Sequence, residues 1–408
     1  MPSSSVPVIV GYGSVTALGT SSQEALRAMR DRTVNCLCLE SRFFPPDVSC
    51  PCFAVDGLAD RLRQCGADSL LAGRRENRTV LLAVAAICEA LERASLSLSE
   101  LRRKRVGVVL GTTVGCTFHN EDYYLEWRNG EDPAPEPLFT YLSANLAARV
   151  QAVLGCDGPG LVITNACASG TDAIGVAKTW LQTDRCDIAI AGGADELSRV
   201  ACHGFHSLRL YSSEPCKPFA RGRQGLNLGE GAGVLIMEPG AVERERKIYG
   251  RVLGYGASGD GYHPTAPHPQ GMGLQRAVAR ALTESGIGVN DISLINAHGT
   301  GTPANDRAET AAIAALGFSE SQSVVISTKG MTGHTLGAAG GVEAVFTLMS
   351  LNEGRTVGSV GCLCPDSDLA FSVLPEAEER LLAGKVGLSQ SLAFGGSNSA
   401  LVLEGAVL

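Results

Sequence analysis

The chain has 408 residues, of which 45% are apolar and 19% charged, and its formal net charge at pH 7 is −8. This length can bury a large core, as one large domain or as two. The negative charge argues against a general electrostatic grip on nucleic acid. No long uncharged apolar run and no basic-then-apolar leader is present, so we expect neither membrane insertion nor secretion.

The fourteen cysteines are a distinctive part of the composition. Their spacing lacks the paired Cys-x-x-Cys knuckles of zinc modules, because Cys50 and Cys52, like Cys362 and Cys364, lie too close together. In a long chain without a leader, reduced thiols are more common than disulfides. We therefore expect a cytoplasmic protein with free cysteines.

The first half of the chain alternates apolar segments with glycine turns. It opens with a β-prone segment that ends in Gly11-Tyr12-Gly13, and residues 74–96 place apolar side chains at helical spacing, which predicts a covering helix. Residues 115–153 hold aromatic and proline-rich stretches that break any simple period. We expect this insertion to form a lid or a subunit contact.

Cys167 lies where a short β-prone run, residues 161–163, enters a turn of small residues followed by a helical segment. This pattern predicts a strand, a sharp turn and a helix, with the thiol at the helix N-terminus. Unpaired N–H groups and the helix dipole would favour the thiolate there, and small neighbours would let a substrate approach. A buried structural cysteine is the alternative interpretation.

Two histidines in the second half have a similar setting. His298 and His334 each lie in a glycine-rich turn behind an apolar strand. A lone histidine is commonly structural, but together with Cys167 these two predict a convergent site. A Cys-His-His zinc site is one possibility, although no two ligands lie at close helical spacing. Acyl chemistry is the other, because a thiolate accepts an acyl group and two imidazoles can donate to one carbonyl oxygen. We favour the second and expect no metal.

The sequence also contains a faint internal duplication. The segments that echo one another are 8–14 and 251–258, 161–175 and 324–348, and 187–193 and 392–396. Each half would thus supply a βαβαβ-like layer with buried strands that end in glycine turns. We predict a first half, 1–247, with the cysteine and the insertion, and a second half, 248–408, with both histidines, around one shared core.

Several motifs occur in a characteristic order along nearly the whole chain. They are Val10-Gly11-Tyr12-Gly13, Asn165-Ala166-Cys167-Ala168-Ser169-Gly170, Ala191-Gly192-Gly193-Ala194, Lys217-Pro218-Phe219, Leu228-Gly229-Glu230-Gly231-Ala232-Gly233, the two histidine turns, and Phe394-Gly395-Gly396-Ser397-Asn398. Together they resemble the β-ketoacyl-[acyl-carrier-protein] synthase family, of the elongating type with a Cys-His-His site. The resemblance implies an α/β chain with the thiolase-like five-layer αβαβα fold, built from two related halves and usually homodimeric.

The resemblance implies a role for each residue of the site. Cys167 would be the acyl-accepting nucleophile. His298 and His334, as neutral donors, would bind the carbonyl of a malonyl thioester and stabilise the carbanion equivalent left by decarboxylation. Lys329 would anchor the network, with Glu343 as its acidic partner.

The same resemblance implies how the substrate is held. The backbone N–H groups of Cys167 and Phe394 would form an oxyanion hole, and the Phe394 ring would gate the acyl pocket. Thr300 and Thr302 match positions that bind the phosphopantetheine arm, although their hydroxyls would also stabilise a turn. Val114 occupies a chain-length position.

The implied reaction is a decarboxylative Claisen condensation by an acyltransferase, in which an acyl thioester and malonyl-acyl carrier protein give a 3-oxoacyl carrier. It needs no further cofactor, because the phosphopantetheine of the acyl carrier protein carries the substrates. One alternative is a thiolase acting on acyl-CoA, but its usual second cysteine would lie near Phe394-Gly395-Gly396, where none is present. The other is a non-catalytic partner like a chain-length factor, and a heterodimer with such a relative is the alternative to a homodimer.

Two departures from the common fatty-acid enzymes predict a different acyl selectivity. Leu226 stands where they carry a bulky aromatic residue, and Leu392-Ala393 replaces the usual Phe-Gly before Phe394. We therefore expect a polyketide or aryl-polyene type of pathway. For the acidic carrier protein, the candidate docking surfaces are two basic clusters: residues 102–105, and the set Arg209, Lys217, Arg221 and Arg223.

Overall fold

A ten-stranded sheet runs through the protein in the order β10-β9-β13-β14-β8-β1-β7-β6-β4-β5, and two small two-stranded sheets pair β2 with β3 and β11 with β12. The computed structural model describes residues 6–39, 43–44, 48–74, 76–115, 120–143, 145–240 and 246–406. The strands are β1 (Val8–Val15), β2 (Leu37–Leu39), β3 (Cys50–Cys52), β4 (Val106–Gly111), β5 (Gly160–Ile163), β6 (Ile188–Asp195), β7 (Gly231–Glu238), β8 (Gly250–Gly259), β9 (Ile292–Asn296), β10 (Val324–Ile326), β11 (Arg355–Val357), β12 (Glu379–Leu381), β13 (Val386–Leu392) and β14 (Ser397–Gly405).

The large sheet is symmetric about the junction of β1 and β8. Strands β5, β4, β6, β7 and β1 correspond in order to β10, β9, β13, β14 and β8. In each half the outer three strands are parallel and the inner pairings are antiparallel. At the junction, the described residues of β1 and β8 form two pairs, Val8 with Arg251 and Ile9 with Gly250. The duplication is therefore a property of the fold, whereas a boundary at residue 247 stays a prediction.

Helices cover and separate the two halves of the sheet. The helices are α1 (Ser22–Arg30), α2 (Leu58–Gln64), α3 (Ala67–Leu71), α4 (Arg78–Ala94), α5 (Leu98–Leu101), α6 (Asn120–Arg128), α7 (Glu136–Ser143), α8 (Leu146–Leu154), α9 (Ser169–Gln182), α10 (Arg199–Ser207), α11 (Met272–Ser285), α12 (Pro303–Ala315), α13 (Lys329–Thr332) and α14 (Ala339–Glu353). Among the described residues, no helix is both long and apolar enough to cross a membrane.

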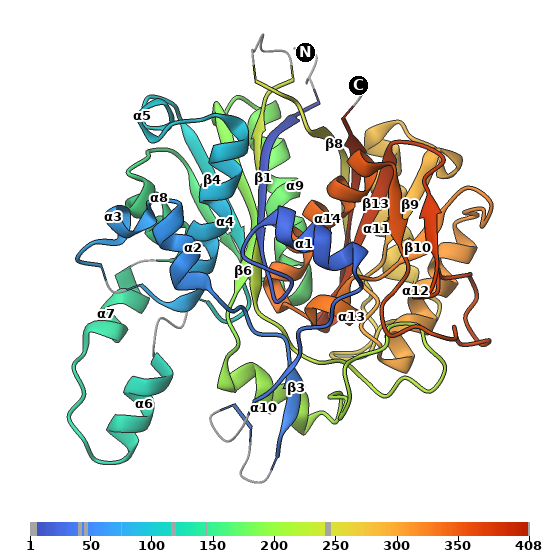
Figure 1. Cartoon of the computed structure of the whole chain (residues 1–408), viewed down its shortest axis with the longest axis horizontal. Coiled ribbons are helices and arrows are strands. Elements are labelled where there is room, and N and C mark those ends of the chain that lie inside the picture. The colour runs from blue at the N-terminus through green and yellow to red at the C-terminus, as the bar shows by residue number, and fades with distance from the viewer. Residues whose placement is uncertain are drawn as a thin grey trace.

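These elements form five layers (Figure 1). Helices α9 and α14 lie in the middle, where they contact each other and strands from both halves of the sheet. Helices α4 and α8 cover the outer face of the first half, and α11 and α12 cover the outer face of the second. This is the αβαβα order that the resemblance implies, and the α/β fold class is confirmed.

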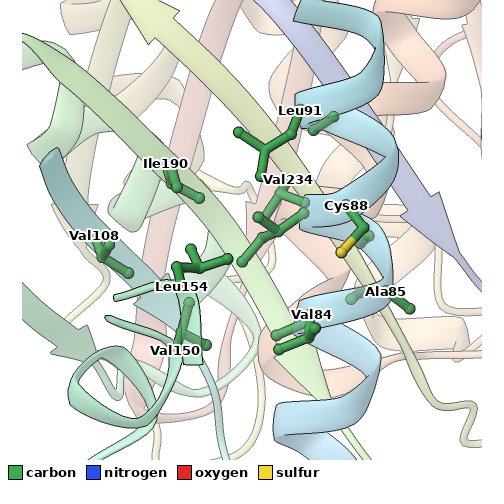
Figure 2. Close-up of a cluster of buried hydrophobic side chains, with 14 of the residues drawn as sticks. Val84, Ala85, Cys88, Leu91, Val108, Val150, Leu154, Ile190 and Val234 are labelled. Carbon is green, nitrogen blue, oxygen red and sulfur yellow. The ribbon is translucent and has the colours of Figure 1, made fainter. Parts of the chain in front are cut away.

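Apolar side chains fill the space between the layers. Figure 2 shows the outer layer of the first half, where Val84 and Leu91 of α4 and Leu154 of α8 face Ile190 of β6 and Val234 of β7. All five side chains are buried. Each contributes about 1.5–3 kcal/mol to the free energy of unfolding through the burial of its apolar surface.

The glycines of the repeated Gly-Tyr-Gly motif let a helix lie directly on a strand. On β1, a Cβ atom at Gly11 or Gly13 would lie 2.1 Å from a backbone carbonyl oxygen of α4. On β8, a Cβ atom at Gly254 or Gly256 would lie 2.1 or 2.0 Å from a carbonyl oxygen of α11. Since no side chain fits in that space, the two motifs serve the same packing purpose in the two halves.

The predicted insertion divides into two parts with different surroundings. Helix α8 belongs to the outer layer, whereas α6 and α7 project from the body of the molecule (Figure 1). The exposed side chains of α6 and α7 include Tyr124, Trp127, Phe139 and Tyr141. Residues 116–119 and 144 of the insertion lie outside the described residues. The role of the insertion as a lid or subunit contact stays a prediction.

Candidate active site

Cys167 lies in a 3₁₀ turn, Ala166–Ala168, between β5 and the central helix α9. Ala166 has a φ of +45°, a left-handed conformation that is unusual for a residue with a Cβ atom. Ser169 holds the turn, because its Oγ accepts from Asn165 N at 2.8 Å and donates to Ala166 O at 2.6 Å. The local order of strand, turn and helix is the one expected from the sequence.

The pKa of the Cys167 thiol is raised, not lowered. Burial raises the pKa of Cys167 to about 12, although the charge of Lys329 and the N–H group of Phe394 act in the opposite direction. The prediction that the helix N-terminus favours the thiolate stays a prediction, and burial acts against it. Burial disfavours the thiolate because the anion loses its hydration, and the cysteine is only 5% exposed.

His298 follows β9 and His334 follows β10 and α13, and both reach the same place as Cys167. His334 Nε2 lies 3.0 Å from Cys167 Sγ. The ring centroids of His298 and His334 are 5.0 Å apart. One ligand atom from each of the three side chains lies within 4.8 Å of the other two. The structure thus brings the three predicted residues together in one buried cluster.

Hydrogen bonds from neighbouring groups fix the proton on each imidazole. Leu336 N donates to His334 Nδ1 at 3.2 Å, and Lys329 Nζ lies 3.2 Å from His298 Nδ1. Because an amide N–H and an ammonium can only donate, Nδ1 is the acceptor and each neutral ring carries its proton on Nε2. Burial, reinforced by the charge of Lys329, lowers the pKa of both histidines well below 6.5. Both rings are therefore neutral Nε2–H donors.

This arrangement of protons bears on the zinc alternative. A metal ion would need the lone pair of Nε2. Each ring would then have to move its proton to Nδ1 and lose its hydrogen bond to Leu336 or Lys329. The ion would also lie near the buried ammonium of Lys329. The donor set therefore suits a carbonyl oxygen better than a cation.

Lys329 supports His298 from the protein interior. Its Nζ donates to the carboxylate of Glu343 and to the backbone oxygen of His298 at 2.6 Å, in addition to the imidazole contact. Both Lys329 and Glu343 are almost completely buried. Burial raises the pKa of Glu343 to about 7 against the opposing charge of Lys329. Removing either partner alone would leave an uncompensated buried charge, so the pair acts as one unit.

Two carboxylates that the sequence reasoning missed hold the His298 loop. Glu309 accepts from His298 N at 2.6 Å and from Gly299 N at 2.8 Å, and burial raises its pKa to about 8. Asp306 lies one turn earlier on α12 and pairs with Arg223 at 2.9 Å. A signal was available, because acidic residues three apart at the start of a helix lie on one face.

One residue of the predicted basic docking cluster, Arg223, is not on the surface, so the prediction is wrong for that residue. The side chain of Arg223 is 2% exposed, and its guanidinium pairs with Asp306 and, at 2.6 Å, with Asp366. Arg223 therefore belongs to the support of the His298 loop and cannot meet a partner protein. Arg209 and Arg221 are exposed.

A cavity of about 360 Å³ opens onto the cluster. Its wall includes the predicted residues Thr300, Thr302, Leu226 and Phe394, and the two threonine Oγ1 atoms lie 2.9 Å apart. The other residues of the wall are Cys167, Phe205, Leu208, Leu210, Thr265, Ala266, Pro267, His298, Pro303, Ala304, Asn305, His334, Leu392 and Ala393. Val114 is not among them; it is buried in an apolar cluster behind the wall, where it belongs to the same cluster as Leu226.

Phe205 of α10 is a wall residue that the sequence reasoning missed. Its ring stacks on Phe394 with centroids 5.2 Å apart, and its centroid lies 6.4 Å from that of His334. The loop after Phe394 is tied down, because Gly395 N donates to Pro264 O at 2.7 Å. No motif marks Phe205 in the sequence, so only the fold places it at the site.

Family models match the chain on both halves. The model described as "Beta-ketoacyl synthase, N-terminal domain" matches residues 69–242, and "Beta-ketoacyl synthase, C-terminal domain" matches residues 249–362. A protein from Synechocystis sp. named "3-oxoacyl-[acyl-carrier-protein] synthase 2" is 35% identical over 412 residues, which cover 97% of each chain. One of the same name from Staphylococcus aureus strain COL is 36% identical over 345 residues, which cover 81% of this chain and 82% of that protein.

Solved structures with the same fold cover the whole chain. A β-ketoacyl synthase from Burkholderia phymatum aligns with a TM-score of 0.86 and 27% identity over 99% of this chain and 100% of that one. The ishigamide ketosynthase/chain length factor aligns with a TM-score of 0.84 and 27% identity, over 99% and 100%. A structure of a type II PKS acyl-carrier protein in complex with its ketosynthase aligns with a TM-score of 0.86 and 25% identity, over 98% of this chain and 100% of that one. The protein therefore belongs to the beta-ketoacyl synthase family.

Proposed function

We propose that the protein catalyses the decarboxylative condensation of an acyl group, carried on Cys167, with malonyl-acyl carrier protein. The product is a 3-oxoacyl carrier two carbons longer. The observation that supports this most is the pair of neutral Nε2–H donors beside one thiol at the end of a cavity. Family membership and the names of the relatives point to the same reaction.

The first step is acyl transfer to the sulfur. Cys167 Sγ attacks the carbonyl carbon of an acyl thioester, the carbon–sulfur bond to the carrier breaks, and the carrier thiol leaves with the proton of the cysteine. The N–H groups of Cys167 and Phe394 would bind the oxygen that becomes negative. In support, the Phe394 N–H already points at the sulfur and lowers its pKa.

The second step uses the two imidazoles. The thioester carbonyl oxygen of the malonyl group would accept from Nε2–H of His298 and of His334. The carbon–carbon bond to the carboxylate then breaks and carbon dioxide leaves. The electron pair of that bond stays with the thioester and forms an enolate, whose negative charge lies on the oxygen between the two donors. The enolate carbon attacks the acyl-Cys167 carbonyl, and the cysteine thiolate leaves. Neutral rings suit this step because they keep the donors without adding a fixed charge.

The substrate arm would enter along the Thr300 and Thr302 wall. The cavity wall includes Leu208 and Leu210, the chain neighbours of exposed Arg209, so this arginine lies close to the cavity. We propose that this arginine meets an acidic acyl carrier protein. Residues 102–105 precede β4, whereas Cys167 follows β5, which pairs with β4 in parallel, so the two lie at opposite ends of these strands. The second basic cluster is therefore the better docking candidate.

For the assembly we propose a homodimer, because this chain alone supplies the thiol, both imidazoles and the lysine. A heterodimer is the alternative, because one structural neighbour is the ishigamide ketosynthase/chain length factor. A polyketide or aryl-polyene pathway and a cytoplasmic location are part of the same proposal. No cofactor besides the phosphopantetheine of the carrier is required.

Intact-mass measurement tests the reaction. The protein is incubated with an acyl carrier protein bearing an octanoyl group, and malonyl carrier is added afterwards. We expect an acyl adduct that Cys167→Ala abolishes, and a 3-oxoacyl product that His298→Ala prevents while loading continues. Loading without condensation in the wild type would overturn the proposal in favour of a transferase or partner role. Equal turnover of acyl-CoA without carrier would favour a thiolase.

A further inference from the structure

The turn that carries the nucleophile occurs twice in the fold. The 3₁₀ turn Ala166–Ala168 leads into α9, and the 3₁₀ turn Leu336–Ala338 leads into α14. The first residue of each turn is left-handed, with φ of +45° and +52°. Helices α9 and α14 occupy equivalent places in the symmetric sheet. Gly337 is therefore the structural counterpart of Cys167.

The second turn already holds an anion supplied by the chain. Asp195, the last residue of β6, accepts from Gly337 N at 2.6 Å and from Thr113 N at 2.7 Å through Oδ2. Its Oδ1 accepts from Thr112 Oγ1 at 2.6 Å and from Val114 N at 3.0 Å. Burial raises the pKa of this carboxyl, against the hydrogen bonds from Thr112, Thr113, Val114 and Gly337, which lower it. We take the group as ionised, because donors converge on both of its oxygens and hydrogen bonds of this kind favour the charged form.

These contacts join the turn after His334 to the loop of Val114. In the turn after His334, two successive N–H groups have separate tasks: Leu336 N fixes the proton of His334, and Gly337 N is held by Asp195. The opposite side of the carboxylate holds the loop of Val114. Asp195 is completely buried, so it reaches neither solvent nor the cavity wall.

We propose that Asp195 is a positioning residue, a built-in anion that fills the second copy of the turn and, through Gly337 and Leu336, orients the Nε2–H donor of His334. It also holds the Val114 loop against this turn. The kinetic consequence rests on the proposed condensation, but the anion site itself does not. A buried carboxylate with a purely structural task is the competing explanation.

Formate rescue tests the anion site directly. Asp195→Ala removes the carboxylate and leaves space for one, so sodium formate should raise its melting temperature more than sodium chloride does at equal ionic strength. This readout uses no substrate. If the wild type failed to condense, the proposed function would fall while this comparison still decided on the anion site.

The kinetic test separates positioning from stability. In Asp195→Ala, acyl loading of Cys167 should stay within a few-fold of wild type, while condensation per loaded enzyme falls at least about tenfold, the value of one charge-assisted hydrogen bond. Formate should restore part of that rate. Asp195→Asn keeps the volume without the charge, so it should show the same fall and no response to formate.

Glu89→Ala is the matched control. Glu89 is also buried and accepts backbone N–H groups, from Ser14 and Ser22, but far from the His334 turn in the sequence and outside the cavity wall. It should lower the melting temperature and leave the ratio of condensation to loading unchanged. Wild-type condensation in Asp195→Asn, or no advantage of formate over chloride in Asp195→Ala, would overturn the proposal.

Discussion

The imidazole planes of His298 and His334 lie almost at right angles, 85° apart, with their centroids separated by 5.0 Å. Two donors in this relation can approach one oxygen from two directions without colliding. Each ring is fixed by its own partner, Lys329 for His298 and Leu336 for His334. The pair is thus preorganised before any substrate arrives, which is the condition under which such donors accelerate a reaction most.

The role of the His334 N–H donor can be tested by removing the side chain or by replacing it with a shorter one that still carries an N–H group. His334→Ala should lower the condensation rate by about 10²–10³-fold, the typical effect of removing one donor to a developing oxyanion. His334→Asn keeps an N–H donor with a shorter reach and should lose less. The measurement is product formation from acyl-loaded enzyme and malonyl carrier. Equal losses in the two variants would mean that the ring, and not its N–H group, is needed.

Lys329 should control the acid limb of the pH profile. Its charge is one of the causes that lower the pKa of His298 and His334. Without the positive charge of Lys329 the pKa values of both histidines rise. The rings then become protonated at a higher pH and are no longer neutral donors. The double variant Lys329→Met with Glu343→Gln avoids an unpaired buried carboxylate.

In this double variant the acid limb of the condensation rate should move to higher pH. The measurement is the rate as a function of pH for pre-loaded enzyme. Lys178→Met with Glu284→Gln is the control, because that partly buried ion pair holds neither histidine. An acid limb at the wild-type position in the Lys329 variant would contradict the role given to its charge.

Leu226 should set which acyl groups enter. It is 3% exposed and contributes to the cavity wall, so a phenylalanine there would narrow the space. Leu226→Phe should therefore reduce turnover of aryl and polyene primers relative to saturated medium chains, by about 5- to 150-fold for a mismatch of about 1–3 kcal/mol. Competition assays on paired acyl carriers measure this ratio. Comparable turnover of both primer classes by the wild type would argue against special tuning.

Arg209 should affect carrier binding and not chemistry. Arg209→Glu places a negative charge close to the cavity, so the KM for carrier-bound substrate should rise and the effect should shrink at high salt. Arg103→Glu is the control, since that exposed residue precedes β4 at the other edge of the sheet. An unchanged KM for Arg209→Glu would remove this surface from consideration. Arg223 is unsuitable for the test because it is buried in an ion-pair network.

Much of the architecture could be predicted because the two halves use the same local chemistry. The Gly-Tyr-Gly motif occurs twice since each copy meets a helix backbone at a distance that excludes a side chain. The turns of Cys167, His298 and His334 could be placed at strand ends from their glycine content. Their convergence follows because the turns that precede the central helices α9 and α14 contact each other.

Features that depend on how deeply a side chain is buried could not be predicted from the sequence. The raised pKa of Cys167 follows from its burial, which sequence spacing does not reveal. Arg223 looks like a surface cation until Asp306 and Asp366 are seen around it. Asp195 has no neighbour in sequence that suggests its task, because its partners come from two distant loops.

The nucleophile belongs to one half of the chain and both imidazoles to the other, while the described residues of the strands at the junction form two pairs. The position of the Cys167 sulfur relative to the nitrogen atoms of His298 and His334 must therefore depend on how the central helices α9 and α14 pack together. These touch through glycine: a Cβ atom at Gly170 would lie 2.7 Å from the backbone nitrogen of Gly341. A single methyl group at that crossing would push the helices apart and misalign the reacting atoms without altering any residue that performs the chemistry.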